Sequence, residues 1–378
     1  MQIKNDTDGM ALALEWAAKG MYITAPNPRV GCVIVRDGEV IGAGHTQPAG
    51  QAHAEIQALR DAAARGKDVR GATAYVTLEP CSHYGRTPPC SNALVEAGLK
   101  RVVAAMGDPN PLVAGRGMAQ LQAAGIETAS GVLADAAHEL NIGFFSRMRR
   151  GRPWVRLKTA ASLDGMTALE NGESQWITGP QARADGHAWR ARACVILTGI
   201  GTVKADDPQL TVRGIDMPAV EDHAPRQPRR VIVASRLEID PGARILQGEP
   251  CWIVAAVADP GKEAGLRAAG HEVIFLPNAA GKVDLAALML ELGRREINEV
   301  HVEAGSKLNA SLVREGCVDE LLVYLAPSLI GVGQGMFALP ALDRLADRIA
   351  LRFHAVTQVG SDLRILARIM KTEIKTEN

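Results

Sequence analysis

Long apolar segments are missing from this sequence of 378 residues, and so is an excess of charge of either sign. No run of about eighteen consecutive apolar residues occurs, which is the length that a membrane-spanning helix needs, so we expect no membrane partner. Lysine plus arginine and aspartate plus glutamate both number 42, which gives a formal net charge of zero. Proteins that bind nucleic acid usually carry a basic excess or a basic stripe, so this balance argues against a nucleic-acid partner.

Cysteine is also scarce. Six cysteines in a chain of this length do not make a disulfide framework. The first nine residues are polar, carry two aspartates and lack the basic end and apolar run of a secretory signal. We therefore expect a reduced, cytoplasmic protein.

The length predicts two or three domains of about 100–200 residues each. In the first half, segments with the apolar pattern of strands alternate with segments that have helical spacing. Asp8 is a candidate cap for the first helix, Gly20 a stop, and Asp37-Gly38 a hairpin turn. The predicted strands are 30–35, 40–43, 72–78 and 102–105, and the predicted helices are 10–20, 53–65 and 92–97. This alternation favours a layered α/β fold.

The second half is also α/β. Its predicted strands are 155–159, 194–197, 231–234, 252–255, 299–302 and 321–324. The basic, Gly- and Pro-containing stretch RMRRGRP at 147–153 is interpreted as a linker, although composition alone fits a solvated loop within one domain equally well. We predict domains at 1–147 and 152–372, and a surface loop at 214–227.

Metal-binding residue types gather in two segments, His53-Ala54-Glu55 and the stretch from Cys81 to Cys90. One imidazole and two thiolates suit Zn²⁺, and three protein ligands leave the fourth tetrahedral position for water, as in catalytic sites. Zinc lowers the pKa of its water to about 7. Glu55 is then the proton shuttle, which takes a proton from the water and delivers it to a leaving amine.

Residues two apart do not share a helix face, so His53 and Glu55 converge only if the zinc lies beyond a helix N-terminus. The segment with Cys81 likewise ends a strand and leads toward a helix. His45 and His83 are spare candidates, and His83 could contact substrate. The remaining cysteines lie in or beside apolar runs and are interpreted as core; they are Cys32, Cys194, Cys251 and Cys317.

Zinc deaminases carry H-x-E followed by P-C-x-x-C, whereas eight residues separate the cysteines here. That spacing, with PNPRVGCVIV at 26–35 and TLEPCSHYGRTPPC at 77–90, resembles the riboflavin-biosynthesis deaminases. KTAASLDGMTA at 158–168, GESQWITG at 172–179, ADDPQLTVR at 205–213 and VEAG at 302–305 resemble the reductase half of the same family. The sequence is thus similar, over about residues 10–370, to the bifunctional enzymes that deaminate a phosphoribosylaminopyrimidine and then reduce its ribosyl group to ribityl.

The resemblance implies a cytidine-deaminase-like three-layer α/β/α domain, followed by a dihydrofolate-reductase-like α/β domain that uses NADPH. It implies His53, Cys81 and Cys90 as zinc ligands, Glu55 as proton donor, and Asn27 near the pyrimidine. From the residues alone, Asn27 between two prolines would be a turn residue. The implied partner is a small-molecule substrate, and we expect a homo-oligomer, either a dimer or a tetramer.

For the reductase half, a Rossmann fingerprint is rejected because Lys204 occupies the third glycine position after Gly199 and Gly201. A better phosphate candidate is Gly305, which follows a strand and opens a helix at 308–314, although it could be a simple turn. The resemblance places the cofactor at Ala160, Trp176, Thr202, Asp206, Ser235, Gly305, Ser306, Lys307, Leu308, Asn309, Ala310 and Ser311. It places the substrate at Lys158, Ser174, Arg190, Leu210, Arg213 and Glu303.

Arginines are the residues best suited to the phosphates of both ligands. Arg190 and Arg213 suit the ribose phosphate of the substrate because a guanidinium fork can donate two hydrogen bonds. Arg236 follows Ser235 at the end of a strand, where it either contacts the 2′-phosphate of NADPH or points into solvent. Without the motifs, each arginine would be a solvated surface charge.

Two other functions are weighed against this one. A nucleic-acid deaminase with an unrelated C-terminal domain is disfavoured by the zero net charge and by the absence of interleaved basic and aromatic residues. A structural zinc module is disfavoured because only three strong ligands accompany Glu55.

Overall fold

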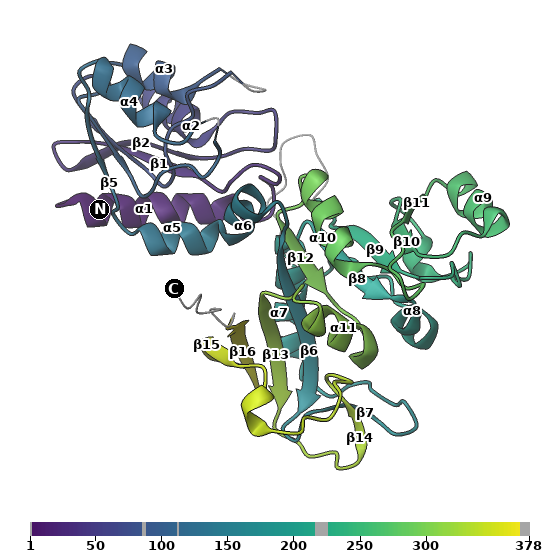
Figure 1. Ribbon diagram of the computed structural model, residues 1–378. Coiled ribbons are helices and arrows are strands. Elements are labelled where there is room, and N and C mark those ends of the chain that lie inside the picture. Colours follow the sequence, from purple (N-terminus) through teal and green to yellow (C-terminus); the bar gives the residue numbers. More distant parts are fainter. Residues whose placement is uncertain (1, 85–87, 112, 216–225, 371–378) are drawn as a thin grey trace, which may run out of the picture. The chain divides into compact units, whose positions relative to one another are not determined.

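The computed structural model describes residues 2–84, 88–111, 113–215 and 226–370. These residues form two compact units, of which the first contains the described residues up to Gly151 together with Arg226. The second begins at Arg152 (Figure 1). Among the described residues, no helix is both long and apolar enough to cross a bilayer.

The first unit is a five-stranded sheet with helices on both faces (Figure 1). Its strands are β1 Gly31–Arg36, β2 Glu39–His45, β3 Thr73–Val76, β4 Arg101–Ala104 and β5 Glu127–Ser130, in the order β2-β1-β3-β4-β5. Its helices are α1 Asp6–Lys19, α2 Ala54–Ala64, α3 Cys90–Glu96, α4 Arg116–Ala123, α5 Ala134–Leu140 and α6 Ile142–Arg150.

Alternation along β1 builds two cores. Cys32 and Ile34 pack into the core that α2, α3 and α4 share, whereas Val33 and Val35 pack into the core that includes α1 and α5. Because successive side chains of a strand point to opposite faces, both faces must be covered. The predicted three-layer α/β/α arrangement is therefore confirmed.

The turns and caps agree with the sequence except at α1. Asp37 and Gly38 both have positive φ, 53° and 77°, as the predicted two-residue hairpin requires. The cap of α1 is Asn5, whose side chain accepts a hydrogen bond from the Asp8 nitrogen, so the prediction of Asp8 as cap is wrong. The helix starts earlier because Asp6 and Asp8 in the first turn stabilise the positive end of its dipole.

The predicted linker at 147–153 is wrong for its first half, because α6 continues to Arg150. Three arginines fill its last turn, where cations interact favourably with the carbonyl end of a helix. Gly151 then ends the helix with a φ of 68°. Most of the predicted surface loop at 214–227 lies outside the described residues.

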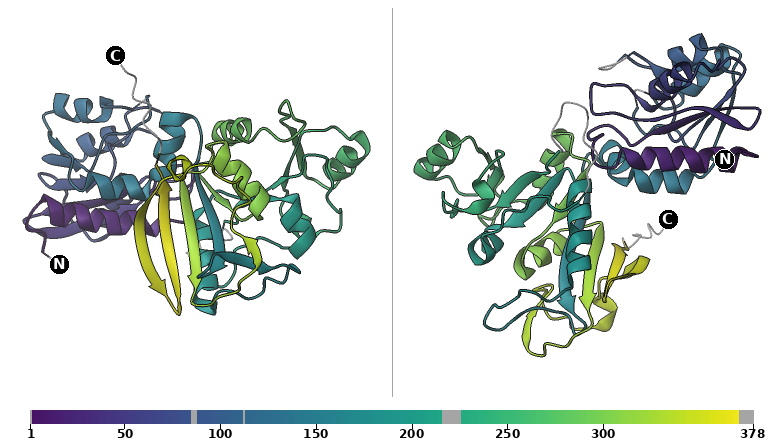
Figure 2. Two further views of the ribbon diagram at one scale, coloured as in Figure 1. Left: turned by 60° about the horizontal axis from the view of Figure 1, so that its bottom comes forward. Right: turned by 180° about the vertical axis from the view of Figure 1, so that it is seen from behind.

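The second unit has a nine-stranded sheet in the order β11-β10-β9-β8-β12-β6-β13-β16-β15. The strands are β6 Trp154–Ser162, β8 Val195–Gly199, β9 Arg229–Val233, β10 Trp252–Ala255, β11 Glu272–Phe275, β12 Glu299–Val302, β13 Glu320–Ala326, β15 Leu351–Val359 and β16 Asp362–Ile369. The first seven in spatial order are parallel, and β16 and β15 add an antiparallel edge, coloured yellow in Figure 2.

Helices and a small ribbon complete this unit. The helices are α7 Pro180–Arg192, α8 Ile200–Asp206, α9 Pro260–Ala268, α10 Leu285–Arg294 and α11 Ser306–Arg314, with short 3-10 turns at Arg244–Leu246 and Leu345–Asp347. The ribbon pairs β7 Met166–Leu169 with β14 Gly333–Gly335.

The central strands of this sheet have one apolar and one polar face. On β6, Val155 and Leu157 pack into the main core with α10 and α11. Arg156 points the other way and is 3% exposed, between the carboxylates of Glu299 on β12 and Glu320 on β13. Buried charges therefore line the face that α7 covers, because the ring of Trp189 from α7 stacks on the Arg156 guanidinium.

Candidate active sites

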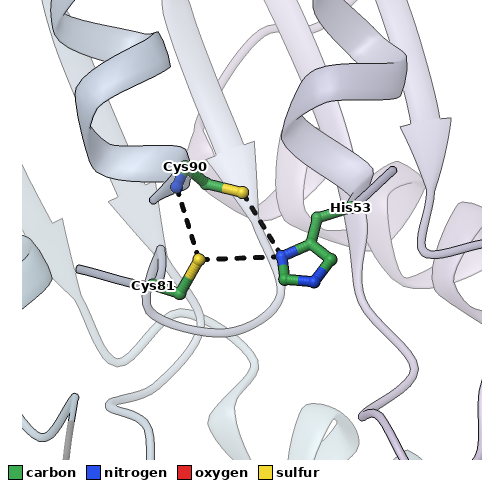
Figure 3. Close-up of side chains that lie close together, drawn as sticks. All are labelled: His53, Cys81 and Cys90. Atoms are coloured by element: carbon green, nitrogen blue, oxygen red, sulfur yellow. Dashed lines mark hydrogen bonds between the residues drawn. The ribbon is translucent and has the colours of Figure 1, made fainter. Parts of the chain in front are cut away.

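The first unit brings His53, Cys81 and Cys90 together at one point (Figure 3). His53 Nδ1 lies 3.6 Å from Cys81 Sγ and 3.4 Å from Cys90 Sγ. A zinc tetrahedron with Zn–S of about 2.3 Å and Zn–N of about 2.0–2.1 Å has edges of roughly 3.6 Å. Both distances from His53 are thus close to those that zinc requires, and the three ligand atoms all lie within 4.8 Å of one another.

The local fold explains why these residues meet. His53 is the N-cap of α2 and Cys90 is the first residue of α3, so two helix N-termini converge as the sequence predicted. The start of β1 pairs with the end of β2 at His45, and the Gly31 carbonyl accepts from the Thr77 nitrogen just beyond β3. The loops before β1, after β2 and after β3 therefore leave the sheet at the same edge.

Hydrogen bonds within the site shift the pKa values of both thiols. The neighbouring Cys90 thiol lowers the pKa of Cys81 to about 4, helped by His53 and by the Cys90 backbone nitrogen, which donates to Cys81 Sγ at 3.3 Å. The same sulfur contact and burial raise the pKa of Cys90. The pair thus favours one thiolate beside one thiol, and a divalent cation between the sulfurs stabilises both as thiolates.

Glu55 lies one residue into α2 and is 4% exposed. Burial, followed by the charge on Cys81, raises the pKa of Glu55 to about 7. A carboxyl group with a pKa near neutrality is able both to accept and to donate a proton. The ligand types, the ligand spacing and this neighbouring acid together fit a catalytic zinc site.

Glu79 is a residue of this site that sequence reasoning missed. Its carboxylate is 4% exposed and accepts from four backbone nitrogens, those of Asp108, Gly115, Gly117 and Met118, at 2.9–3.3 Å. It holds the start of α4 against the segment that leads into Cys81. A Cβ on Gly117 would lie 2.0 Å from the Pro80 carbonyl oxygen, so the two segments are in close contact.

Replacing Glu79 with alanine is expected to destabilise the first unit by at least about 3 kcal/mol, because several buried N–H groups lose a charged acceptor. A thermal melt followed by circular dichroism measures this effect. Glu15→Ala on the exposed face of α1 is the control and should melt like the wild type. Equal melting temperatures for both variants would show that the carboxylate is dispensable.

The other cysteines and His45 lie apart from the ligands. Cys32, Cys194, Cys251 and Cys317 are all buried, which confirms their interpretation as core. His45 Nδ1 lies 3.1 Å from the Thr46 carbonyl oxygen, and its ring stacks on Trp16. His83 is half-buried, and neither histidine belongs to the metal-ligand cluster found among the described residues.

Asn27 lies in a turn before β1, where its backbone nitrogen donates to the Thr24 carbonyl at 2.9 Å. Arg29 anchors this loop through the carbonyls of Met21 and Leu140, at 3.1 and 2.8 Å. The loop precedes Gly31 and so belongs to the sheet edge that carries the metal ligands. Asn27 is therefore both a turn residue and a residue at this edge.

In the second unit, three predicted substrate residues meet at the carboxyl end of β12. Glu303 forms a two-pronged ion pair with Arg190 of α7, and Lys158 Nζ of β6 lies 4.0 Å from Glu303 Oε2. Arg190 also donates to the Thr211 carbonyl at 3.2 Å. The fork predicted to bind phosphate is thus occupied by a carboxylate.

Arg213 is linked to Arg190 and Glu303 through hydrogen bonds to His187 and Thr211. Its backbone nitrogen donates to His187 Nδ1 at 3.2 Å, and its guanidinium donates to Thr211 Oγ1 at 3.2 Å. Leu210 is buried nearby in sequence, with a positive φ of 50°. Ser174 and Trp176 lie on a separate loop between β7 and α7, where the Trp176 ring packs against Arg183 and is 70% exposed.

The predicted cofactor residues gather where the adjacent parallel strands β8 and β12 end. Gly199 and Gly305 are the N-caps of α8 and α11, so α11 starts two residues before the predicted 308. A Cβ on Gly199 would lie 3.0 Å from the Leu308 side chain, and one on Gly305 would lie 3.8 Å from Thr202 Oγ1. Two helix N-termini with their amides facing outward form a cradle that suits a pyrophosphate.

Other predicted cofactor residues surround this edge. Ser235 follows β9 and accepts from the Val283 nitrogen at 3.4 Å, and Arg236 beside it is exposed. Asp206 ends α8, and burial raises its pKa. Ala160 lies on β6 and packs against the apolar cluster that includes Leu322, Tyr324 and Ala182. The residues present therefore fit a dinucleotide laid across the carboxyl ends of the strands.

Fold and sites together define a zinc-dependent deaminase unit joined to a nucleotide-dependent reductase unit. Residues 3–106 match the cytidine and deoxycytidylate deaminase zinc-binding region, and residues 153–365 match the RibD C-terminal domain. Riboflavin biosynthesis protein RibD of Escherichia coli (strain K12) is 48% identical over 362 residues, which cover 94% of this chain and 96% of that protein.

Solved structures agree with these matches. The structure of Acinetobacter baumannii RibD, form 1, aligns with a TM-score of 0.88 at 42% identity and covers 97% of this chain and 99% of that one. A diaminohydroxyphosphoribosylaminopyrimidine deaminase/5-amino-6-(5-phosphoribosylamino)uracil reductase from Thermotoga maritima aligns with a TM-score of 0.84 at 31% identity, with the same coverage. The chain belongs to the RibD family, the bifunctional deaminase–reductases of riboflavin biosynthesis.

Family membership confirms several predictions at once. The two folds are cytidine-deaminase-like and dihydrofolate-reductase-like, and the Rossmann alternative is excluded. The cofactors are zinc for the deaminase unit and NADPH for the reductase unit.

Proposed function

We propose that residues 1–147 deaminate 2,5-diamino-6-ribosylamino-4(3H)-pyrimidinone 5′-phosphate and that residues 152–372 reduce the ribosyl group of the product. The first step releases ammonia, and the second converts 5-amino-6-(5-phosphoribosylamino)uracil to its ribityl form. The names of both activities in the Thermotoga maritima relative support these substrates. The observation that carries the proposal is the His53, Cys81 and Cys90 cluster with Glu55 buried beside it.

In the deaminase unit, the His53 imidazole and the two cysteine sulfurs would hold the metal. Zinc bound there supplies a Lewis acid that makes water nucleophilic near neutral pH. Glu55 takes a proton from the attacking water and delivers it to the departing amine, for which a pKa of about 7 is well suited. Asn27 contacts the pyrimidine from the loop before β1.

In the reductase unit, NADPH supplies the hydride and the protein supplies binding and orientation. The first turns of α8 and α11 bind the cofactor phosphates, with Thr202, Asp206 and Ser235 around them. Ala160 and Trp176 complete the cofactor site, and Ser174 and Leu210 complete the substrate site. Because Glu303 occupies the Arg190 fork, we assign the substrate phosphate to Arg213 and assign Arg190 to holding Glu303 in place.

The test follows ammonia release and NADPH oxidation with the phosphoribosylaminopyrimidine as substrate. Both signals should appear in sequence, and NADPH oxidation should require prior deamination. Cytidine, adenosine and single-stranded DNA serve as comparison substrates. Faster ammonia release from any of them would contradict the proposed substrate and favour a nucleoside or nucleic-acid deaminase.

Arg236→Ala should weaken the reductase with NADPH about ten- to a hundredfold and leave NADH unaffected, because a charged hydrogen bond to the 2′-phosphate is worth about 1.5–3 kcal/mol. Arg236 is exposed beside Ser235 at the carboxyl edge of the parallel strands, where dinucleotides bind. Reductase kcat/KM with each cofactor measures the effect. Equal losses with both cofactors, or no loss, would show that Arg236 does not contact this phosphate.

We further propose that the protein is a homo-oligomer assembled through β15. This edge strand exposes both faces, with Phe353 69% and Val356 56% exposed, and the preceding segment exposes Leu345 at 78%. A long apolar edge strand invites pairing with another chain. A second copy would extend the sheet and cover these side chains.

Phe353→Lys is therefore expected to reduce the mass of the particle in solution, since a charge in the interface must be desolvated. Light scattering coupled to size exclusion measures the mass. Leu290→Lys, which changes a 43% exposed leucine on α10, is the control. A variant that keeps the wild-type mass would place the interface elsewhere.

A further inference from the structure

One strand links the substrate group of the reductase unit to the buried charges beneath it. Along β12 and the residue after it, Glu299, His301 and Glu303 alternate with Val300 and Val302, which pack into the main core. The three polar residues therefore share the opposite face. Two of them are engaged in strong ion pairs, and His301 lies between them.

His301 is a buried histidine whose ring is not hydrogen-bonded to any of the described residues. It is 1% exposed, and neither ring nitrogen has a hydrogen-bond partner among the described residues. A buried polar group without a partner is costly and calls for an explanation. Its Nε2 lies 3.4 Å from Glu303 Oε1, which is close enough for a hydrogen bond, but the contact does not have the orientation of one.

The surroundings of His301 determine its protonation. Burial lowers the pKa of His301. The neighbouring Glu303 carboxylate acts in the opposite direction, and the Arg190 and Lys158 cations oppose a further positive charge. Arg156 is the residue paired with His301 on the neighbouring strand β6. The lowered pKa favours the neutral ring, which carries one N–H, and Nε2 is the ring nitrogen that lies 3.4 Å from Glu303.

We propose that His301 is a positioning residue of the reductase, which donates from Nε2 to Glu303 and holds this carboxylate against the bound substrate. The inference rests on the proposed role of Glu303 in binding substrate. Arg190 of α7 donates hydrogen bonds to both carboxylate oxygens of Glu303, and the Lys158 ammonium group of β6 lies 4.0 Å from the same carboxylate. His301 adds a contact from the strand that carries Glu303 itself, so the carboxylate is fixed from three elements.

The experiment compares His301→Gln with His301→Met, two unbranched side chains of similar size of which only glutamine offers an N–H. Met should lower reductase kcat/KM on the deaminated substrate about tenfold or more, the range for one charged hydrogen bond. Gln should restore most of the loss. The dissociation constant for NADPH and the rate of ammonia release should be unchanged in both variants, which verifies that each unit is folded.

Equal activity of the two variants, whether both normal or both impaired, would overturn the inference, because the donor would then make no difference. If the Met variant does not fold, His301→Leu replaces it in the same comparison. Glu303→Gln tests the proposed role of Glu303 separately from that of His301. If it is fully active, the proposed role of Glu303 fails and the inference fails with it; if it is impaired while the histidine variants are normal, only the inference fails.

Discussion

Replacing Cys81 or Cys90 with serine is expected to bring the zinc content from about one ion per chain to near zero and ammonia release to background. The hydroxyl of serine is a poor substitute for a thiolate ligand, and two remaining ligands do not retain the ion. Metal analysis and an ammonia assay on the same preparation measure both effects. NADPH oxidation on the deaminated substrate should persist, since the second unit has its own core.

Cys317→Ala is the control for this experiment, because that thiol is buried in the core of the second unit and belongs to no metal-ligand cluster among the described residues. It should keep its zinc and its deaminase activity. Full metal content in both serine variants would disprove the ligand assignment, whatever their activity.

Glu55→Gln should keep the zinc and lower the deaminase rate about 10²–10⁴-fold, the usual cost of losing a general acid–base group. Glutamine has nearly the same shape but cannot carry the proton. The measurement is again zinc content beside ammonia release. Glu96→Gln, an exposed glutamate on α3, controls for a change of charge in the same unit. Loss of the metal, or a rate equal to that of the wild type, would contradict the shuttle role.

The zinc site was predictable because its chemistry lies in short sequence motifs. His53 and Glu55 are two residues apart, and both cysteines lie in one segment at the end of a strand. Local patterns also predicted that two helix N-termini would converge there. Glu79 was not predictable, because its partners are backbone N–H groups 29–39 residues away, and every residue type except proline offers such a group.

In the reductase half, too, contacts between residues far apart in the sequence could not be predicted. The resemblance singled out Arg190 and Glu303 separately, yet their ion pair joins residues 113 apart and could not be read from either motif. His301 lies on a strand where polar residues alternate with valines, and this pattern predicts neither its burial nor its partners. Charged residues also hid two helix boundaries, because α1 begins at Asp6, before its apolar pattern, and α6 runs through a basic stretch to Arg150.

The buried arginine on β6 has a consequence for how the sheet assembles. A shift of β6 by one residue would turn Arg156 into the apolar core and move Val155 and Leu157 onto the charged face. An uncompensated buried charge is far more costly than the loss of a few apolar contacts. We therefore expect Arg156, Glu299 and Glu320 to act during folding as a check on strand alignment, which rejects wrong pairings of the central strands more than it stabilises the correct one.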